Sequence, residues 1–216
     1  MAVISGPPRR PNRRGEGARL RDEIVHAATG LAEENSDLSG ITLRAVARRA
    51  RITAPSIYAH FGNLDDVIDA VIASTFEDLV RSLERDLQGH TDPIARLRAL
   101  CRGYVSFGAG NPRLYRLLFG PDRPQSTSLT TKSIDSMPGA KAFDLLVGNI
   151  HACVEAGQSS STDPQRDATA LWAALHGYVG LLASRPDFPW PPHDGVVDQF
   201  VDRLAYLTPG PGATFS

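Results

Sequence analysis

Cysteine and lysine are scarce in this sequence. Only two of the 216 residues are cysteine, Cys101 and Cys153, and only two of the 23 basic residues are lysine, Lys132 and Lys141. Two widely separated cysteines exclude a disulfide framework and a four-cysteine zinc site, and they suit a reducing compartment. The bias toward arginine is typical of a GC-rich bacterial genome.

A secretory leader and a membrane-spanning run are also missing. Residues 1–15 contain no apolar core segment, which argues against a signal peptide. Residues 168–184 carry no formal charge, but these 17 residues fall short of the roughly 20 that cross a bilayer, and His176 interrupts them. We therefore expect a helix buried in protein, no membrane partner and a cytoplasmic location.

The residue clusters that mark common enzymes do not occur. The sequence has no nucleophile elbow, no glycine-rich phosphate loop, no metal-ligand spacing and no pair of carboxylates on one helix face. Its histidines are scattered, at His26, His60, His90, His151, His176 and His193. We therefore expect a protein that is not an enzyme and that holds no metal or cofactor.

Positive charge is concentrated near the N-terminus. Residues 1–62 hold ten arginines against six acidic residues, whereas residues 63–216 hold 13 basic against 18 acidic residues. A basic third joined to an acidic remainder favours a polyanion as the partner of that third. Residues 1–17 are rich in Pro, Gly and Arg, so we expect a flexible basic arm whose Arg13 and Arg14 contact DNA.

Apolar residues recur with helical spacing from residue 18 onward, and strand-like alternation is absent. We expect a first helix over 18–34, two short helices after it, and a long helix over 63–87 capped by Asn63. Two later helices are predicted by apolar spacing, one around Phe143 and one from Asp194. Three more are predicted by proline after a capping residue, at Asp92-Pro93, Asn111-Pro112 and Asp163-Pro164.

The predicted fold class is all-α, with about nine helices in two domains. The first domain is expected over residues 18–68, and a second, helical domain over residues 69–207. Residues 121–138 are predicted to form a loop, and residues 208–216 a flexible tail rich in Pro and Gly.

The most informative pattern lies in residues 41–67. Two short amphipathic helices are separated by three or four residues and flanked by supporting helices, which is the arrangement of a helix-turn-helix. On spacing alone, two ordinary helices of a bundle remain an alternative. Polar side chains are expected on the outer faces of the short helices, from Arg44, Arg48, Arg49, Thr53, Ser56, Tyr58 and His60.

These residues resemble the DNA-binding domain of TetR-family regulators over residues 18–68. The residues that carry the resemblance are Thr42-Leu43-Arg44, Val46-Ala47, Ala50, Ile52-Thr53 and Ile57-Tyr58-x-His60-Phe61. The resemblance implies DNA-backbone contacts from Thr42 and Arg44, groove contacts from Thr53, Ala54, Pro55 and Ser56, and phosphate contacts from Tyr58 and His60.

Two residues depart from the family pattern. Arg51 stands where a turn glycine is usual, and a left-handed backbone there costs roughly 1 kcal/mol, part of which a phosphate contact would recover. Leu64 stands where a lysine is common, which removes one expected phosphate contact. Arg51 and the helix cap Asn63 complete the predicted DNA-binding set.

Two motifs in the C-terminal part resemble a domain type of the same family that is named for its Trp-His-Gly signature. They are Asn111-Pro112-x-Leu114-Tyr115-x-Leu117-Leu118-Phe119 and Trp172-x-x-x-His176-Gly177. The resemblance places Trp172 and His176, which share a helix face, beside a ligand pocket. A core tryptophan with a hydrogen-bonded histidine is the competing interpretation. The predicted pocket residues are Tyr104, Phe107, Leu117, Phe119, Phe143, Trp172 and His176.

The family resemblance implies that residues 18–68 form a helix-turn-helix DNA-binding domain and residues 69–207 a ligand-binding and dimerisation domain. It also implies a homodimer on a palindromic operator in double-stranded DNA. Small residues within 164–184, together with a terminal helix over 195–207, would form the dimer bundle. A small-molecule effector that favours a different spacing of the DNA-reading helices would release the DNA, with the long helix as the lever. The predicted function is therefore that of a repressor with a small-molecule effector.

Two other regulators remain open from the sequence. One senses redox state through Cys101 and Cys153, although both lie on apolar stripes, which favours buried and inert thiols. The other has no ligand and acts through a protein partner, and a filled C-terminal core without a pocket would support it.

Overall fold

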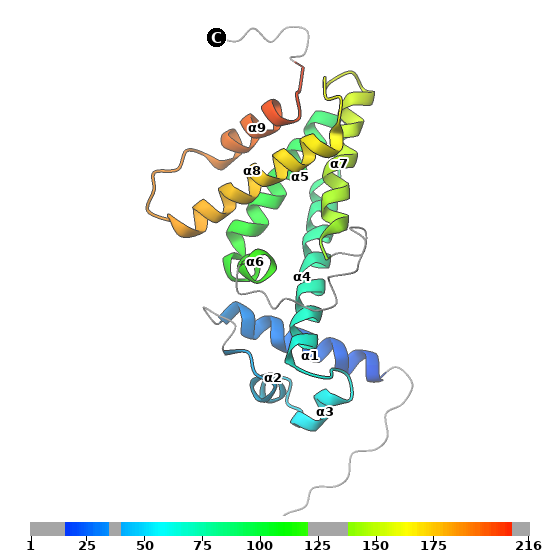
Figure 1. Ribbon diagram of the computed structural model, residues 1–216, viewed down its shortest axis with the longest axis vertical. Coiled ribbons are helices and arrows are strands. Elements are labelled where there is room, and N and C mark those ends of the chain that lie inside the picture. The colour runs from blue at the N-terminus through cyan, green and yellow to red at the C-terminus, as the bar shows by residue number, and fades with distance from the viewer. Residues whose placement is uncertain (1–15, 35–39, 121–137, 209–216) are drawn as a thin grey trace, which may run out of the picture. The chain divides into compact units, whose positions relative to one another are not determined.

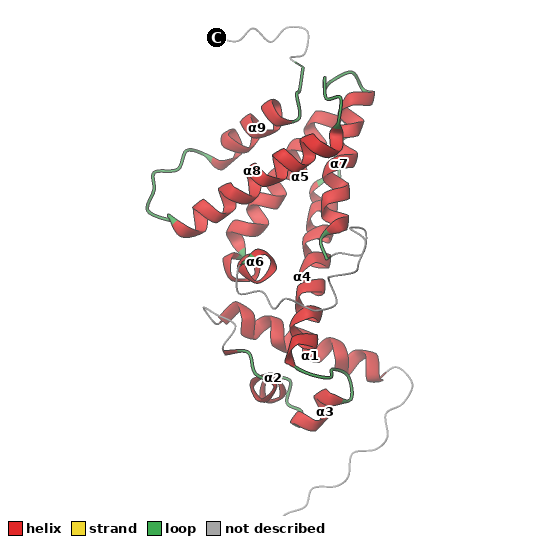
Figure 2. Cartoon of the chain, viewed as in Figure 1, coloured by secondary structure: helices red, strands yellow, loops and turns green. Residues whose placement is uncertain are grey.

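The structure is a computed structural model that describes residues 16–34, 40–120 and 138–208. Within these ranges the chain forms nine helices and no strand, apart from one isolated bridge between Ser159 and Leu207 (Figures 1 and 2). The helices are α1 Glu16–Glu34, α2 Leu43–Arg49, α3 Ala54–Tyr58, α4 Leu64–Asp86, α5 Pro93–Gly110, α6 Pro112–Phe119, α7 Ala140–Glu155, α8 Pro164–Ser184 and α9 His193–Leu204. The predicted all-α fold is confirmed.

Three predicted segments lie almost entirely outside the described residues: the basic arm over 1–17 with Arg13 and Arg14, the loop over 121–138, and the tail over 208–216. Among the described residues, no helix is long and apolar enough to cross a membrane.

The chain divides into two compact units, residues 1–71 and residues 72–216. The helix α4 belongs to both, because its residues 64–71 lie in unit 1 and the remainder lies in unit 2. The roles expected for the two domains stay predictions at this point.

Unit 1 closes around a small apolar core. α1 packs against α2, and α2 packs against α3. Ile24, Val46, Ile57 and Val67, one residue from each of the helices α1 to α4, are fully buried. Burial of each such side chain contributes about 1.5–3 kcal/mol. This packing holds α2 and α3 in place, since helices this short do not persist alone in water.

Polar caps set where the helices of unit 1 begin. Thr42 Oγ1 accepts a hydrogen bond from Ala45 N at 3.1 Å, before α2. Before α4, Asn63 Oδ1 accepts from Asp66 N at 2.9 Å, and Asp66 Oδ2 accepts from Gly62 N at 2.9 Å. The predicted cap at Asn63 is confirmed, and Thr42 caps α2 in the same way, so the two residues fix the ends of the segment between α2 and α4.

The turn between α2 and α3 closes on a left-handed arginine. Arg51 has φ 54°. Ile52 N donates to Ala47 O at 3.0 Å and Arg51 N donates to Arg48 O at 3.2 Å, which are the two hydrogen bonds of a Schellman motif. Glycine is favoured in the left-handed position because a Cβ atom is strained there. The departure at Arg51 therefore places roughly 1 kcal/mol of backbone strain in the turn.

The central helix of unit 2 is α5. It packs against α6, α7, α8 and α9, and α8 also packs against α7 and α9 (Figure 1). Leu97, Ile150, Leu171 and Val201, one residue from each of α5, α7, α8 and α9, are fully buried. The core of unit 2 therefore lies around α5.

Ion pairs fix the register of α9 along α5. Arg98 Nη2 donates to Asp202 Oδ1 at 2.7 Å, and Arg102 Nε donates to Asp198 Oδ1 at 3.0 Å. The two arginines are four residues apart on α5, and the two aspartates are four residues apart on α9. Each set therefore lies on one face of its helix, and the ion pairs join these two faces. Partly exposed pairs of this kind contribute up to about 1 kcal/mol each, and their main effect here is on register.

The strained turn makes a testable difference to stability. Arg51→Gly is expected to raise the free energy of unfolding of unit 1 by about 1 kcal/mol, because glycine adopts a left-handed φ without strain. Native-state hydrogen exchange of the buried amides of α1 and α2 measures this in the full chain.

The adjacent Ala50 provides the matched control, since its φ of −73° is right-handed. Ala50→Gly is expected to lower the stability of unit 1, because glycine there adds flexibility to the unfolded chain. Faster exchange in the Arg51→Gly protein than in the wild type would contradict the strain argument.

Candidate functional sites

The helix α3 turns one side into unit 1 and the other to solvent. Ile57 is fully buried, whereas the neighbouring Tyr58 is 60% exposed. Thr53 Oγ1 and Ser56 Oγ are hydrogen-bonded at 2.9 Å, and Pro55 beside them is exposed. The outer surface of α3 therefore presents short side chains and hydroxyl groups, which allow a backbone to approach base edges and phosphates.

Four arginines border the outer surface of α3, and Arg49 differs from the other three because its side chain is hydrogen-bonded within unit 1. Arg44, Arg48 and Arg51 are exposed, and their side chains make no hydrogen bond or ion pair with any described residue. Arg49 instead donates to Glu34 Oε2 at 2.6 Å, which ties α2 to α1. This hydrogen bond raises the pKa of Arg49 and lowers the pKa of Glu34. Arg49 is thus occupied within unit 1, and the other three guanidinium groups are available to a polyanion.

The two capping residues keep hydrogen-bond donors for a second partner. The side-chain oxygens of Thr42 and Asn63 accept backbone hydrogen bonds. The hydroxyl hydrogen of Thr42 and the amide hydrogens of Asn63 remain able to donate to a phosphate, and both residues are exposed. His60 is half-buried just after α3, so only part of its ring faces solvent.

All the predicted DNA-binding residues except Arg13 and Arg14 lie in the described part of unit 1. The structure brings together Thr42, Arg44, Arg51, Thr53, Ala54, Pro55, Ser56, Tyr58, His60 and Asn63 around α2, α3 and the start of α4. Each of these residues is exposed or half-buried. Contact with DNA by each of them stays a prediction.

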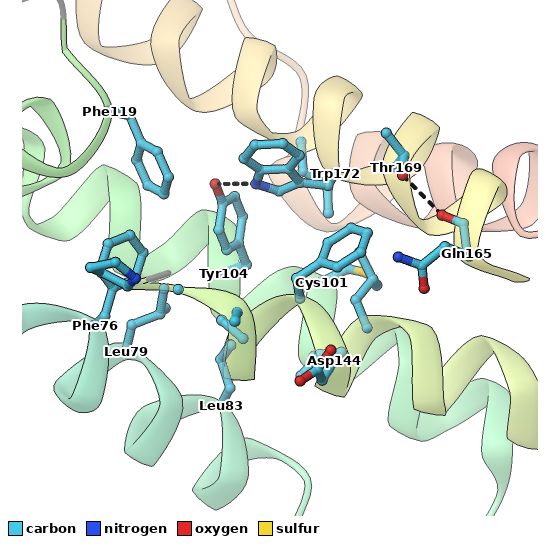
Figure 3. A pocket seen from close by; sticks show the side chains of 18 residues that line it. Phe76, Leu79, Leu83, Cys101, Tyr104, Phe119, Asp144, Gln165, Thr169 and Trp172 are labelled. Atoms are coloured by element: carbon cyan, nitrogen blue, oxygen red, sulfur yellow. Dashed lines mark hydrogen bonds between the residues drawn. The ribbon is translucent and has the colours of Figure 1, made fainter. Parts of the chain in front are cut away.

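Unit 2 contains a cavity of about 530 Å³ (Figure 3). This volume lies within the range of about 300–1,000 Å³ that small-molecule sites occupy. Leu79, Leu83 and Cys101, each at most 2% exposed, form its buried part. The other described lining residues are Phe76, Leu100, Tyr104, Phe119, Pro138, Gly139, Ala140, Ala142, Phe143, Asp144, Leu146, Gln165, Thr169, Trp172 and Leu175.

Small residues at the start of α7 leave this space open. Gly139, Ala140 and Ala142 line the cavity and fill little of it. Gly139 also has φ 95°, and a Cβ atom there would lie 2.7 Å from the ring of Phe76. Glycine is required at this position both by the backbone and by the close approach of that ring.

Part of the predicted ligand-binding set lines the cavity. Tyr104, Phe119, Phe143 and Trp172 do so, whereas Phe107, Leu117 and His176 lie outside its lining. Leu117 is 4% exposed and belongs to the helical core. Phe107 is one turn beyond Tyr104 on α5, and His176 is one turn beyond Trp172 on α8.

A chain of hydrogen bonds leads from the cavity wall to His176. Trp172 Nε1 donates to Tyr104 OH at 3.2 Å, as Figure 3 shows. Tyr104 OH and Tyr115 OH lie 2.9 Å apart, and Tyr115 OH lies 2.6 Å from His176 Nδ1. The rings of Tyr115 and His176 are stacked, with centroids 5.4 Å apart. The chain joins α5, α6 and α8 through one polar network.

Burial sets the protonation states in this network. It raises the pKa of Tyr104 and of Tyr115 and lowers the pKa of His176. Above about pH 7 His176 is therefore neutral, and Nδ1 accepts the Tyr115 hydroxyl when the ring proton is on Nε2. Since the indole of Trp172 can only donate, Tyr104 accepts from it and donates to Tyr115. Donation in the order Trp172, Tyr104, Tyr115 and His176 therefore gives each of these side chains a hydrogen-bond partner.

Each of the two interpretations of the Trp-His-Gly motif holds for one of its residues. His176 is half-buried and hydrogen-bonded, as the core interpretation requires. Trp172 is 38% exposed and lines the cavity, as the pocket interpretation requires. Tyr115, which joins the two through Tyr104, was not predicted as a site residue, although its position in the first motif could have suggested it. Asp144, Gln165 and Phe76 also line the cavity, but they belong to no sequence motif and were not predicted.

The two cysteines are poor redox sensors. Cys101 and Cys153 are 1% and 0% exposed. Burial raises the pKa of both thiols, and that of Cys153 to about 11. The thiolate is the reactive form and is scarce at neutral pH in such surroundings. Among the described residues, no group of three or more His, Cys, Asp and Glu side chains could hold a metal ion.

The small-residue face predicted on α8 is not covered by any described residue. Ala170, Ala173, Gly177 and Gly180 are exposed, and Leu181 is 51% exposed. A Cβ atom built on Gly177 or Gly180 would meet no atom within 4 Å. This α8 face allows the close approach of another helix, and its use in a dimer stays a prediction.

Known proteins resemble both units. The profile of the family described as "Bacterial regulatory proteins, tetR family" matches residues 24–71, and the profile described as "Tetracyclin repressor-like, C-terminal domain" matches residues 97–205. The nucleoid occlusion factor SlmA of Aliivibrio fischeri is 27% identical over 113 residues, which are 52% of this chain and 54% of SlmA. The chain spans about half the length of the curated relatives it matches.

Solved structures share the fold over most of the chain. A protein of unknown function from Rhodococcus sp. RHA1 is 27% identical, with a TM-score of 0.72 over 86% of this chain and 93% of its own. The transcriptional regulator FadR from Bacillus subtilis, in complex with stearoyl-CoA, is 14% identical, with a TM-score of 0.63 over 85% of this chain and 97% of its own. At that identity FadR supports the fold alone.

The lowered pKa of His176 predicts a pH dependence of stability. The unfolded imidazole titrates near pH 6.5, and burial favours the neutral form in the folded protein. Stability is therefore full above about pH 7 and is lost as the pH falls below 6.5. The fall in unfolding free energy of unit 2 between pH 7.5 and pH 5.5 is expected to be smaller in His176→Gln than in the wild type.

Tyr115→Phe separates burial from the hydrogen bond. It removes the donor to Nδ1 and leaves the ring of His176 buried, so the pH dependence is expected to persist while stability drops at every pH. Denaturant titrations of the three proteins across this pH range measure both effects. An equal pH dependence of the unfolding free energy in His176→Gln and the wild type would contradict the role assigned to His176.

Proposed function

Since this chain belongs to the TetR family of bacterial regulatory proteins and is a transcription regulator of that family, we propose that it is a cytoplasmic repressor released from its operator by a small molecule. In this proposal unit 1 binds double-stranded DNA, two chains form a homodimer, and the cavity of unit 2 binds the effector.

The exposed surface of α3 is the observation that carries the DNA-binding assignment. Ile57 anchors the helix in the core, which leaves Tyr58, Thr53 and Ser56 on the outside. The guanidinium groups of Arg44 and Arg51 lie on the same unit and have no partner among its described residues. A short helix with exposed hydroxyl groups and neighbouring guanidinium groups suits the edge of a major groove and its phosphates.

The proposed dimer follows from the geometry of DNA. Two recognition helices on successive major grooves of one DNA face must lie about 34–36 Å apart, and a twofold dimer supplies that spacing. The uncovered α8 face, with Gly177, Gly180 and Leu181, is the surface we assign to the partner chain. A helical packing of this kind is common in intersubunit bundles.

The proposed coupling uses α4. Phe76, Leu79 and Leu83 of α4 line the cavity, and residues 64–71 of the same helix belong to unit 1. A ligand that binds better to one position of α4 than to another shifts the population of DNA-binding geometries. A coupling free energy of about 1–3 kcal/mol would change operator affinity by roughly 5–150-fold.

A second candidate function comes from the similarity to SlmA. That relative is named a nucleoid occlusion factor, which is not the name of an effector-controlled repressor. A DNA-binding protein without a small-molecule effector, acting through a protein partner, is the corresponding alternative. The open cavity of about 530 Å³ supports the effector-controlled repressor over this alternative.

The DNA-binding assignment predicts two distinct salt responses. Tyr58→Phe removes one hydrogen bond from an uncharged hydroxyl group to a phosphate, so it is expected to weaken operator binding about tenfold, with the salt dependence unchanged. Arg44→Gln removes one phosphate contact, so the slope of log affinity against log salt should fall by about 1. Fluorescence anisotropy with palindromic duplexes from upstream of the protein's own gene measures both.

Tyr206 offers a matched control for Tyr58, because it is 51% exposed and lies in unit 2. Tyr206→Phe is expected to bind the operator like the wild type. Size-exclusion chromatography checks that every variant keeps the wild-type oligomeric state. Wild-type affinity in both Tyr58→Phe and Arg44→Gln would remove the assigned DNA contacts.

The effector assignment predicts a variant that binds DNA and ignores the effector. Ala142→Phe places a ring in the cavity, so it should keep operator affinity and lose the roughly 5–150-fold release that the effector causes in the wild type. Effectors are first selected by thermal shift and then tested in the anisotropy assay.

His151→Phe is the control for this experiment, since His151 is exposed on α7 and does not line the cavity. It should respond to the effector like the wild type. Release of the Ala142→Phe protein at the wild-type effector concentration would show that the effector binds elsewhere.

A further inference from the structure

The charge of the cavity narrows the chemistry of its ligand. Asp144 is the one charged side chain among the described lining residues, and no lysine, arginine or histidine is among them. Its carboxylate makes no hydrogen bond or ion pair with the residues that the structure describes. Lys141, one turn earlier on α7, is exposed and does not line the cavity. Among the described lining residues, the negative charge of Asp144 is therefore unbalanced.

The other polar groups of the wall are mostly occupied. Trp172 Nε1 donates to Tyr104 OH, and Thr169 Oγ1 donates to the backbone oxygen of Gln165 at 2.9 Å. The side chain of Gln165 makes no hydrogen bond within the described ranges. The groups left for a ligand are thus the Asp144 carboxylate and the Gln165 amide, and both residues are exposed at the mouth of the cavity.

The opposite side of the cavity is aromatic. In Figure 3, Phe76, Phe119 and Leu79 lie on one side, and Asp144 and Gln165 lie on the other. The rings of Phe76 and Phe119 are packed there edge to face, with centroids 5.6 Å apart. A second edge-to-face pair, Phe143 and Trp172 with centroids 6.3 Å apart, also lines the cavity. Aromatic faces attract cations, and their area accepts a flat apolar body.

We propose that the effector is an organic cation: an apolar, preferably aromatic, body that fills the space between the rings, with a protonated amine beside Asp144. This inference rests on the proposed function and names the ligand class of its cavity. An anionic ligand would place its charge in a cavity with no described cation to pair with it, which is costly in a partly dehydrated site.

A matched set of probes tests the charge of the ligand. The probes are 2-naphthylmethylamine, 2-naphthylmethanol and 2-naphthoate, which share one aromatic body and are cationic, neutral and anionic at pH 7.5. Isothermal titration calorimetry with the full-length protein is expected to show the amine binding about tenfold more tightly than the alcohol. Naphthoate should bind more weakly than either, and added salt should reduce the difference.

Two variants assign the preference to Asp144. Asp144→Asn keeps the shape of the side chain and removes its charge, so the amine should bind about as weakly as the alcohol while the alcohol is unaffected. Glu155→Gln is the control, because Glu155 is an exposed acid on the same helix and lies outside the cavity lining. It should keep the preference for the amine.

Operator binding by the same preparations separates this inference from the proposed function. Three outcomes would overturn the cationic ligand without contradicting the proposed regulator. They are naphthoate binding as tightly as the amine, an unchanged preference for the amine in Asp144→Asn, and no binding of any probe to protein that binds DNA. If Asp144→Asn loses the preference for the amine but the wild-type protein binds no operator, the result would support the cationic site and count against the repressor.

Discussion

The packing of α5 against α7, α8 and α9 is the interaction on which unit 2 depends. Fully buried side chains such as Leu97, Ile150 and Leu171 hold these helices together. The same packing creates the cavity, since side chains large enough to close it are missing at Gly139 and Ala142. Stability and ligand binding thus draw on one set of contacts, and the space for a ligand lies where the otherwise dense core is interrupted.

Unit 1 shows a different balance, in which short helices are kept in place by long-range burial and local capping. α3 has five residues and would not form in isolation. Ile57 secures it from the inside, and the hydrogen bonds at Thr42, Asn63 and the turn at Arg51 hold both ends of the segment. The outer face of α3 is therefore held in place by the buried side of the helix and by the hydrogen bonds at its two ends.

The sequence was sufficient to predict the helices and the exposure of the side chains around α3, because both depend on local signals. Apolar spacing, the caps at Thr42 and Asn63, and proline after Asp or Asn report on neighbours in the chain. The left-handed backbone at Arg51 could be expected because the family pattern has glycine there. These signals concern a few consecutive residues and do not require knowledge of the tertiary packing.

The cavity was predicted only in part, because its lining comes from five helices that meet through tertiary packing. Aromatic residues near the motifs, such as Phe119 and Trp172, were correctly expected to line a pocket. Leu117 and His176 were not separated from them, since the direction of a side chain from its helix depends on how that helix packs. Asp144 and Gln165 belong to no motif, so only the assembled structure shows that they face the same space.

The uncovered α8 face has a consequence for how the proposed repressor would respond to its own abundance. A chain whose apolar stripe is covered only by a second copy exists as a mixture of free and paired molecules, governed by mass action. When pairing is incomplete, the concentration of paired molecules rises with the square of the total. A modest increase in synthesis would then produce a disproportionate increase in operator occupancy, and a modest decrease would clear the DNA.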